Sequence, residues 1–319
     1  MHELIDSLFI ERFASEELRR KSDSAIIKVG TKRIAFTTDS YVVDPIFFPG
    51  GDIGSLAVYG TVNDLAVCGA RPLHISLGLV IEEGLDMAVL EKITDSIARA
   101  AKRSNVDIVT GDTKVVGKGS CDRIFINTSG IGEVYYTGLD PDRIAAGDSV
   151  IVSGPVGEHA VSVLSKREGL SFASAVKSDS APLNGLIGKI LSTSGKVRFM
   201  RDPTRGGLAA TLNEIAEGRS FGITLNEKDV PVSNGVRSAC EMLGLDPLYL
   251  ACEGRAIVVV SKEEERKVLN AMRRDPLGRL GRVIGAITKE YKGKVVLNTV
   301  SGGKRIIDMP AGEQLPRIC

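Results

Sequence analysis

Hydrophobic and polar residues follow strand and helix periodicities in turn along the first half of the chain. Residues 33–38 predict a strand that runs into Asp39, and residues 53–68 carry hydrophobic residues at helical spacing. Asp86 is expected to cap a helix whose hydrophobic face begins at Val89. Further strands are predicted at 73–81, 106–110 and 123–135. This half therefore predicts a mixture of strands and amphipathic helices.

The second half begins after a break in this pattern. Residues 137–147 combine Pro, Gly and Asp and form the expected hinge between two domains. Helices are predicted near 158–167, 182–193 and 204–217, and strands at 149–153, 256–261, 282–287, 295–300 and 304–308. We predict a two-domain α/β (α+β) fold, with an N-terminal domain of residues 1–146, a C-terminal domain of residues 147–306 and a flexible tail of residues 307–319.

Composition narrows the class of protein. The chain has 319 residues, of which 43% are hydrophobic, enough for a sizeable core in each domain. The net charge of +1 gives no reason to expect nucleic acid or a membrane surface as a partner. The first residues are acidic where a signal peptide would need a basic start and a hydrophobic run. We therefore expect a cytoplasmic protein.

The five cysteines differ in their sequence settings. No CxxC pair occurs, so free thiols are expected in a reducing compartment. Cys68 and Cys252 have the hydrophobic or small neighbours of core positions. Cys319 ends the segment PAGEQLPRIC, whose prolines and glycine resist helix formation. Its place on a segment with little to bury makes Cys319 the candidate working thiol.

Four aspartates recur near predicted strand ends, glycine turns or, in one case, inside a predicted helix. They are Asp23, Asp39, Asp64 and Asp112. Carboxylates at the strand ends of one sheet converge easily, and several together bind Mg²⁺, which usually bridges to nucleotide phosphates. Turn and cap chemistry explains any one of them alone. Asn63-Asp64 is the stronger candidate, because a carboxylate without a partner is costly in a largely hydrophobic helix.

Residues 201–208 (RDPTRGGL) predict an anion site at the start of a helix. Asp202 or Thr204 is expected to cap this helix, and the two glycines allow its backbone to approach a ligand closely. The free N–H groups of the first helical turn suit a phosphate. Arg205 adds a planar set of donors. A plain capped helix start is the alternative interpretation.

Glu253, Lys114 and His159 are weaker candidates when each is taken alone. Glu253 lies between the hydrophobic run LYLA and the strand AIVVV, where burial would raise its pKa and suit it to proton transfer. Lys114 is a possible charge partner of Asp112 or a phosphate ligand, and a solvated lysine is the alternative. His159 stands at a predicted helix start and is expected at the surface or as a cap.

Several motifs together resemble one known family. TTDS, GTVNDLAVCGARP, VTGDTKVV, GDSVIVSGPVGEH, RDPTRGGLA, ACEGR and the terminal PRIC are similar, over nearly the whole chain, to the HypE family of hydrogenase maturation proteins. The motifs NDL, GDT and DPTRGG are shared across the aminoimidazole ribonucleotide synthetase superfamily, which also holds selenophosphate synthetase and thiamine monophosphate kinase. The terminal PRIC distinguishes the HypE family.

The resemblance implies a two-domain aminoimidazole ribonucleotide synthetase-like fold and a homodimer formed by the N-terminal domain, with ATP in a cleft near the pairing surface. It implies Cys319 as the acceptor of the reacting group, with Glu253 and Lys114 as catalytic residues. Nucleotide contacts would come from Asp39, Asn63, Asp64, Gly111, Asp112, Thr113 and Arg205. Mg²⁺ would be held by Asp23, Asp39, Asp64 and Asp112.

The resemblance also implies a reaction and partners. A carbamoyltransferase, HypF, would place a carbamoyl group on Cys319, and ATP-dependent dehydration would convert this thiocarboxamide to a thiocyanate. The cyano group would pass to iron on the HypC–HypD complex and become a cyanide ligand of [NiFe]-hydrogenase. One alternative is a small-molecule kinase or ATP-dependent synthetase, although the first 67 residues lack the cysteine that a selenophosphate synthetase would need. A non-enzymatic scaffold is the other.

Overall fold

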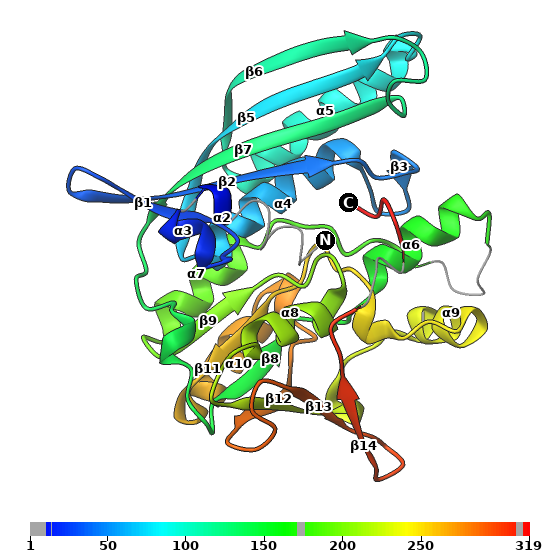
Figure 1. Cartoon of the computed structure of the whole chain (residues 1–319). Coiled ribbons are helices and arrows are strands. Elements are labelled where there is room, and N and C mark those ends of the chain that lie inside the picture. The colour runs from blue at the N-terminus through cyan, green and yellow to red at the C-terminus, as the bar shows by residue number, and fades with distance from the viewer. Residues whose placement is uncertain (1–10, 14, 171–175, 311–314) are drawn as a thin grey trace.

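The computed structural model describes residues 11–13, 15–170, 176–310 and 315–319. Two regions follow each other along the chain (Figure 1). The N-terminal region pairs a five-stranded sheet with two long helices, and the C-terminal region is built on a seven-stranded sheet. The C-terminus lies between the two regions, near β3 (Phe47–Phe48) and α6 (Glu158–Arg167) (Figure 1).

The N-terminal sheet has the strand order β1-β2-β7-β5-β6. Its strands are β1 (Ala25–Val29), β2 (Lys32–Tyr41), β5 (Ala70–Glu82), β6 (Asp107–Val116) and β7 (Ile124–Val134). Neighbouring strands are antiparallel except β5 and β6, which are parallel. Parallel strands need a crossover connection, and α5 (Met87–Ser104) supplies it. Short elements flank the sheet: α2 (Glu11–Phe13), α3 (Glu16–Arg19) and β4 (Gly51–Asp52).

Helix α4 (Ile53–Val67) covers the inner face of this sheet and joins it to the C-terminal region. Asp52 caps its first turn, because the Asp52 side chain accepts hydrogen bonds from Gly54 N at 2.8 Å and Ser55 N at 3.0 Å. The helix is buried around nearly its whole circumference, as expected for a helix that is hydrophobic on all sides. Its Ala66 and Val67 pack into the C-terminal core.

The outer face of the N-terminal sheet is not covered by any described part of the chain. In β2, Ala35 and Thr37 are buried, whereas Phe36 between them is 41% exposed. Ile131 on β7 pairs with Phe36 and is 39% exposed, and Ile27 on β1 is 43% exposed. Large hydrophobic side chains gathered on one open sheet face are typical of an interface.

The C-terminal sheet has the strand order β14-β13-β10-β12-β8-β11-β9, and only β10 and β13 are parallel neighbours. Its strands are β8 (Ser149–Val152), β9 (Val197–Arg201), β10 (Gly222–Asn226), β11 (Ile257–Val260), β12 (Arg282–Thr288), β13 (Val295–Asn298) and β14 (Lys304–Ile307). Helix α8 (Gly207–Ala216) packs on one face, and α7 (Asn184–Thr193) and α10 (Glu265–Arg273) pack on the other. Helix α9 (Asn234–Leu243) lies beside α6 (Figure 1).

Most predicted elements lie near their expected residues, and the differences concern the motifs. The strand expected at 106–110 runs on as β6 to Val116, so Gly111, Asp112 and Thr113 lie inside a strand and not in a turn. The helix after RDPTRGG begins at Gly207. Its first turn is preceded by Gly206 in the left-handed conformation, so the prediction of a cap from Asp202 or Thr204 was wrong.

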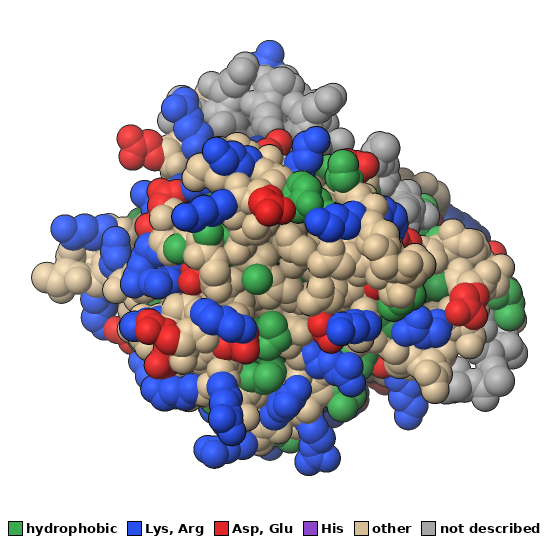
Figure 2. Space-filling view, turned by 90° about the horizontal axis from the view of Figure 1, so that it is seen from below, with side chains coloured by type: hydrophobic (Ala, Val, Ile, Leu, Met, Phe, Trp, Pro, Cys, Tyr) green, Lys and Arg blue, Asp and Glu red, His purple; other side chains and the backbone are tan. Residues whose placement is uncertain are grey.

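The face on the side of the C-terminal sheet differs from the open face of the N-terminal sheet. Figure 2 shows it covered by Lys and Arg side chains with fewer Asp and Glu, and hydrophobic side chains occur there as separate spots. Scattered hydrophobic residues of this kind are normal on a protein surface. Among the described residues, no helix combines the length and the hydrophobicity needed to cross a membrane. The predicted location in the cytoplasm stays a prediction.

Candidate functional site

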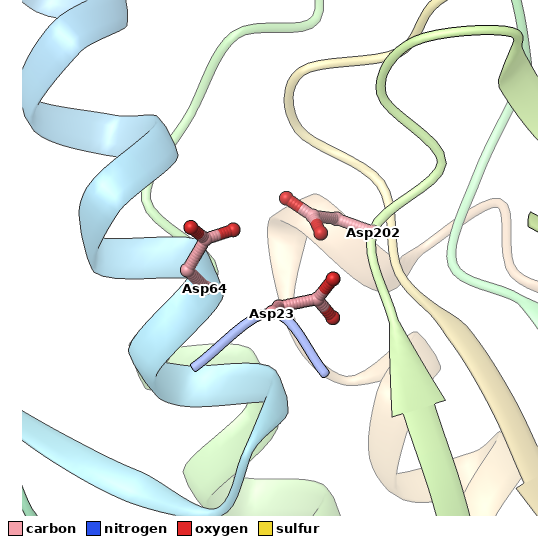
Figure 3. A group of neighbouring side chains, drawn as sticks. All are labelled: Asp23, Asp64 and Asp202. Carbon is pink, nitrogen blue, oxygen red and sulfur yellow. The ribbon is translucent and has the colours of Figure 1, made fainter. Parts of the chain in front are cut away.

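Three aspartates from separate segments meet between the two regions (Figure 3). Asp64 projects from α4, Asp202 follows β9, and Asp23 precedes β1. One carboxylate oxygen of each lies within 4.8 Å of the others. Oxygen ligands at this spacing suit a hard divalent cation such as Mg²⁺. The sequence predicts Asp202 only as a helix cap. The carboxylate reaches the cluster because Asp202 directly follows β9, a strand that the local pattern does not predict.

The electrostatics of this acidic cluster agree with a cation site. Burial raises the pKa of Asp64 well above its usual range, and the nearby carboxylates of Asp202, Asp39 and Asp23 raise it further. Burial and then Asp23 raise the pKa of Asp202 in the same way. The protein supplies only partial compensation, because Thr37 Oγ1 lies 2.8 Å from Asp64 Oδ2. A bound cation would offset this repulsion.

Asp23 and Asp39 stand at the two edges of the cluster. Burial raises the pKa of Asp23, although Arg201 opposes this effect with a hydrogen bond of 2.8 Å from its Nε to Asp23 Oδ1. Burial also raises the pKa of Asp39, which accepts a hydrogen bond of 2.9 Å from the hydroxyl of Tyr41. Both residues are partly buried and their carboxylates act electrostatically on Asp64, while their predicted metal and nucleotide roles stay predictions.

Glu253 lies on the C-terminal side of the same site and is only 2% exposed. Its Oε1 is buried without a hydrogen-bond partner among the described residues. Burial raises the pKa of Glu253 well above its usual range, with further contributions from Asp202, Asp179 and Asp39, while Arg205 lowers it. The expectation of a buried glutamate with a raised pKa is therefore confirmed. When ionised, a carboxylate with a raised pKa is a stronger base than an ordinary one.

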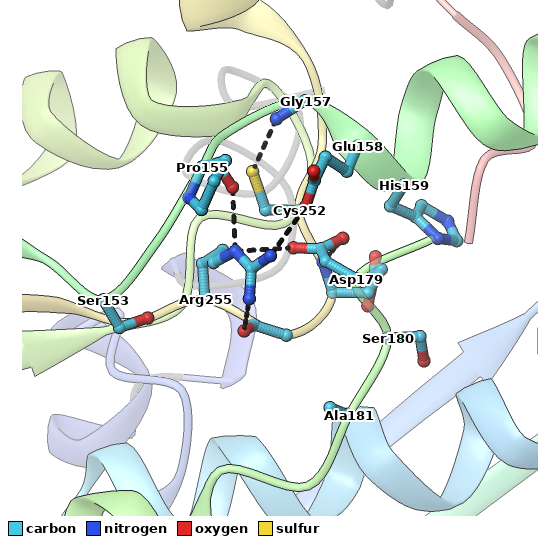
Figure 4. Close-up of polar contacts among 12 residues, drawn as sticks. Ser153, Pro155, Gly157, Glu158, His159, Asp179, Ser180, Ala181, Cys252 and Arg255 are labelled. Atoms are coloured by element: carbon cyan, nitrogen blue, oxygen red, sulfur yellow. Dashed lines mark hydrogen bonds and ion pairs between the residues drawn. The ribbon is translucent and has the colours of Figure 1, made fainter. Parts of the chain in front are cut away.

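A polar network fixes the backbone on which Glu253 stands (Figure 4). The Glu253 N–H donates to Asp179 Oδ1 at 3.3 Å, and the Asp179 carboxylate lies 3.5 Å from Arg255 Nε. Arg255 also donates to the carbonyl of Pro155 at 2.8 Å and to Glu158 at 2.7 Å. The segment around Glu253 is thus held by buried charged hydrogen bonds, which position groups firmly.

Two glycines are required by close approaches beside the site. A Cβ at Gly254 would lie 1.8 Å from the carbonyl oxygen of Asp179. A Cβ at Gly207, whose φ is +60°, would lie 2.4 Å from the carbonyl oxygen of Leu250. The first turn of α8, which Gly207 opens, receives no side-chain cap. Its N–H groups therefore remain suited to an anion, as the sequence predicted.

Asn63 holds the two regions together. Its amide nitrogen donates to the carbonyls of Ala181 at 3.1 Å and Glu253 at 3.2 Å, and its carbonyl accepts from Leu183 N at 2.7 Å. Asn63 is fully buried, and these bonds use both donors and one acceptor position of its amide. The structure thus gives Asn63 a part in positioning the segment of Glu253, and its predicted nucleotide contact stays a prediction.

The end of the chain docks into the site. Residues 317 and 319 run antiparallel to residues 42–44: Val42 N donates to the carbonyl of Cys319 at 3.1 Å, and Asp44 N donates to the carbonyl of Arg317 at 3.2 Å. Ile318 is 5% exposed and packs in the N-terminal core. The flexibility predicted for residues 307–319 is untested, and residues 311–314 lie outside the described residues.

The docked tail brings the Cys319 thiol to the acidic site. Burial raises the pKa of Cys319 to about 12, Glu253 and Asp39 contribute in the same direction, and a hydrogen bond from Arg205 opposes them. A thiol with this pKa is a poor nucleophile while it stays docked. The sequence could not place the tail, and the structure puts its last residue beside Glu253, Asp39 and Arg205.

The GDT motif lies elsewhere in the single chain. Residues on a strand alternate between faces, and paired residues share a face. Asp39 pairs with Thr128, Thr128 with Leu77, and Leu77 with Gly111, so Gly111 shares the inner face with Asp39. Asp112 therefore points to the outer face. Within one chain, the structure does not bring Asp112 to the acidic cluster.

Lys114 lies on the same outer face as Asp112. The two side chains are 68% and 69% exposed, and Lys114 Nζ lies 2.7 Å from Asp112 Oδ2. This ion pair confirms the predicted charge partnership and lowers the pKa of Asp112. Thr113 N donates to Asp112 Oδ1 at 2.9 Å. The predicted roles of Gly111, Asp112, Thr113 and Lys114 stay predictions.

Comparison with known proteins gives the class first. The family profile of the AIR synthase related protein N-terminal domain matches residues 21–134, and that of the corresponding C-terminal domain matches residues 145–298. The fold and the acidic site between the two domains therefore define an AIR synthase related protein. The predicted aminoimidazole ribonucleotide synthetase-like fold is confirmed.

Full-length relatives narrow this class to one family. Carbamoyl dehydratase HypE of Bradyrhizobium diazoefficiens is 49% identical over 322 residues, which cover 100% of this chain and 93% of the relative. A HypE chain from a HypE–HypF complex is 45% identical with a TM-score of 0.91, and the match covers 96% of this chain and 99% of that one. A HypE structure in complex with ATP is 47% identical with a TM-score of 0.87, covering 100% and 96%. The chain belongs to the HypE family, as the motifs predicted.

Proposed function

We propose that this chain is an ATP-dependent carbamoyl dehydratase of [NiFe]-hydrogenase maturation that acts on a group carried by its own Cys319. The observation that carries the proposal is the docked tail, which places the Cys319 thiol next to Arg205 and Glu253. The relatives named carbamoyl dehydratase and the relative solved with ATP support it. The chain is then both the enzyme and the carrier of its substrate.

The chemistry follows from the groups around the thiol. The carboxamide oxygen is a poor leaving group, so it attacks the γ-phosphorus of ATP; the new P–O bond forms as the bond to ADP breaks. Loss of one N–H proton gives an iminophosphate. Removal of the second proton then forms the C≡N bond while phosphate leaves with the former carboxamide oxygen. Glu253, buried with a raised pKa, is the base for these protons, and Arg205 stabilises negative charge on the phosphoryl oxygens.

The acidic cluster fits the metal that phosphoryl transfer needs. Asp23, Asp64 and Asp202 would hold Mg²⁺, and Asp39 lies close enough to contribute electrostatically to Asp64. When bound, the ion supplies neutralisation of phosphate charge. The uncapped start of α8, with Arg205, would receive a phosphate group beside the ion.

The open face of the N-terminal sheet supports the proposed homodimer. Phe36, Ile131 and Ile27 expose hydrophobic surface on this face, and Asp112 and Lys114 lie on it as well. A second copy packed there would cover the hydrophobic residues. It would also receive Lys114 of its neighbour, which cannot reach the site of its own chain. We propose that Lys114 serves the site of the partner copy, where it would stabilise the phosphorylated oxygen.

We propose two further protein partners for this chain, besides a second copy of itself. The relative solved in a HypE–HypF complex supports a HypF-type carbamoyltransferase as the enzyme that loads Cys319. The HypC–HypD complex is proposed as the acceptor of the cyano group because the resemblance to the HypE family implies it. Docked Cys319 is partly buried against the core, so we propose that the tail leaves the site for loading and transfer.

Mass spectrometry of the C-terminal peptide tests the proposal. The chain is incubated with its carbamoyltransferase, carbamoyl phosphate, ATP and Mg²⁺, and the peptide after Lys304 is released with endoproteinase Lys-C and weighed. We expect one carbamoyl group on Cys319 and then the loss of one water, with the second step absent when a non-hydrolysable ATP analogue replaces ATP. An unmodified peptide, or ATP turnover that Cys319→Ala leaves unchanged, would contradict the proposal and favour a small-molecule kinase.

A further inference from the structure

His159 is buried where the sequence suggested a surface or capping residue. It lies in the first turn of α6 and is 0% exposed, so the expectation of a surface histidine was wrong. The imidazole and the ring of Phe48 are perpendicular, with ring centroids 5.3 Å apart. The proposed reaction does not use His159, and a buried imidazole with two polar contacts calls for an explanation.

The two ring nitrogens of His159 contact two different segments of the chain. Nε2 lies 2.9 Å from the backbone carbonyl of Ile318 in the docked tail. Nδ1 lies 2.8 Å from Ser178 Oγ. His159 therefore bridges the tail that carries Cys319 to the segment that contains Ser178 and Asp179.

These contacts define one protonation state of the ring. The Ile318 carbonyl can only accept, so Nε2 must carry a proton. Ser178 Oγ accepts a hydrogen bond of 3.0 Å from Ser180 N and is then free to donate its own hydrogen to Nδ1. Burial, the largest effect, lowers the pKa of His159 and favours the neutral ring. In the neutral Nε2–H tautomer, both ring nitrogens of His159, the Ile318 carbonyl and the Ser178 hydroxyl each have a hydrogen-bond partner.

The segment that contacts His159 through Ser178 also contacts Glu253. Asp179, next to Ser178, accepts the N–H of Glu253 at 3.3 Å. Ser178 N donates to the carbonyl of Pro49 at 2.8 Å, which anchors this segment to the N-terminal domain. A docked tail and the segment that positions Glu253 are thus joined through one imidazole.

We propose that His159 is a positioning residue that holds the C-terminal tail in the docked state, with Ser178 selecting the tautomer that donates to Ile318. The proposal rests on the proposed function only in naming Cys319 as the carrier whose docking matters. The chemistry that recognises the tail is a single N–H donor aimed at a buried backbone carbonyl. Loss of that donor leaves the carbonyl without a partner unless the tail leaves the site.

Thiol labelling of Cys319 tests the proposal without ATP or a carbamoyl donor. The full chain is treated with N-ethylmaleimide for increasing times, and the labelled fraction of the Lys-C peptide that ends at Cys319 is measured by mass spectrometry. The docked thiol is partly buried and its pKa is raised to about 12, so it reacts slowly and labelling proceeds mainly through undocked molecules. The labelling rate therefore reports the undocked fraction.

Two substitutions separate the contacts of the ring. His159→Gln places an amide N–H near the position of Nε2, whereas His159→Asn places its amide near Nδ1 and loses the donor to Ile318. We expect His159→Asn to increase the labelling rate about fivefold or more, the factor that corresponds to one lost buried hydrogen bond. His159→Gln should label at close to the wild-type rate. Ser178→Ala should label at an intermediate rate. The ring keeps a possible donor at Nε2, but Ser178 no longer selects the tautomer that carries the proton there.

Ser162→Ala is the matched control. Ser162 lies on the same helix, is equally buried, and donates a hydrogen bond of 2.6 Å to the carbonyl of Pro49 instead of the tail. Equal labelling of Ser162→Ala and His159→Asn would show general loosening of α6 and overturn the proposal. Labelling of His159→Asn at the wild-type rate would overturn it too. If His159→Asn labels faster while the wild-type chain does not dehydrate its carbamoyl group, the role of His159 stands and the proposed function is refuted.

Discussion

The two faces of the N-terminal sheet carry aspartates of opposite character. On the inner side, Asp64 is buried with other carboxylates, and its pKa is raised. On the outer face, Asp112 is exposed beside Lys114, and its pKa is lowered. The same residue type thus stands in an electrostatically strained cluster on one side and in a satisfied ion pair on the other. A buried acidic cluster that the protein compensates only in part is a site prepared for a cation, and a satisfied surface pair is not.

The comparison also separates what one chain contains from what it lacks. The inner side holds Glu253, Arg205 and the docked Cys319. The outer face holds Lys114 among exposed hydrophobic residues. If the function is as proposed, Lys114 on the outer face of one copy completes the inner site of a second copy.

Removal of the proposed base should have the largest effect. Glu253→Gln keeps the shape of the side chain and removes its ability to accept a proton, so the dehydration rate should fall by about 10²–10⁴-fold. The carbamoyl form on Cys319 should accumulate, which mass spectrometry of the C-terminal peptide would detect. Carbamoylation itself should be unchanged, and this serves as the internal control. Dehydration at the normal rate would remove Glu253 from the mechanism.

Mixing two inactive variants tests whether the outer face serves a second copy. Lys114→Ala and Glu253→Gln chains, dissociated and reassembled together, would form mixed dimers in which one site has both native residues. If Lys114 acts across the dimer, a one-to-one mixture should regain about a quarter of the wild-type dehydration rate. If Lys114 acts in its own chain, the mixture stays as inactive as its components. Light scattering verifies that the mixture is dimeric.

The inner cluster should lose its cation when one carboxylate is neutralised. Asp64→Asn keeps a side chain that can accept from Thr37 but removes a charged ligand. Mg²⁺ affinity, measured by calorimetry, should fall by at least about 10–100-fold, which is the loss expected when groups around a metal are disturbed. Asp112→Asn is the matched control on the outer face. Equal losses in both variants, measured on the isolated chain, would contradict the division between the two faces.

The raised pKa values of the cluster predict the pH dependence of stability. The folded-state pKa of Asp64 and Asp202 lies above the unfolded value of about 4, so their contribution to stability is fully present below that pH and is lost as pH rises through the folded-state pKa. The metal-free protein should therefore melt at a lower temperature as pH rises. Mg²⁺ should stabilise it more at higher pH, because binding needs ionised carboxylates. A Mg²⁺-induced shift in melting temperature that shrinks with rising pH would contradict the assignment.

The smallest effect is expected on the outer face. Asp112→Asn breaks a well-exposed ion pair that solvent screens, so the melting temperature of the isolated chain should be unchanged within the error of calorimetry. Asp64→Asn in the metal-free protein should raise it, since one buried like charge is removed. A destabilised Asp112→Asn chain would show that β6 depends on this pair for its fold.

Sequence reasoning succeeded where local pattern carries the information. Helix α5 and the strand at 73–81 are recognisable because their hydrophobic residues repeat with the period of the element. Strands β1, β9 and β10 were not predicted, because five residues are too few to show a clear alternation. Helices α9 and α10 were not predicted either, although their hydrophobic residues do repeat at helical spacing. The GDT motif was expected in a turn, since glycine beside aspartate is common there, yet strand pairing with β5 extends β6 through it.

The sequence by itself determined which residues are unusual. It marked Asp64 inside a hydrophobic helix, Glu253 between two hydrophobic runs and Cys319 on a segment that does not fold alone, since each conflicts with the polarity of its neighbours. Only the tertiary structure decided which of these meet. Strand alternation sends Asp112 to the other face, and β9 brings the unexpected Asp202 to the cluster. Hydrogen bonds to Val42 and His159 dock the tail at Glu253. Convergence depends on long-range pairing and packing, which no local pattern records.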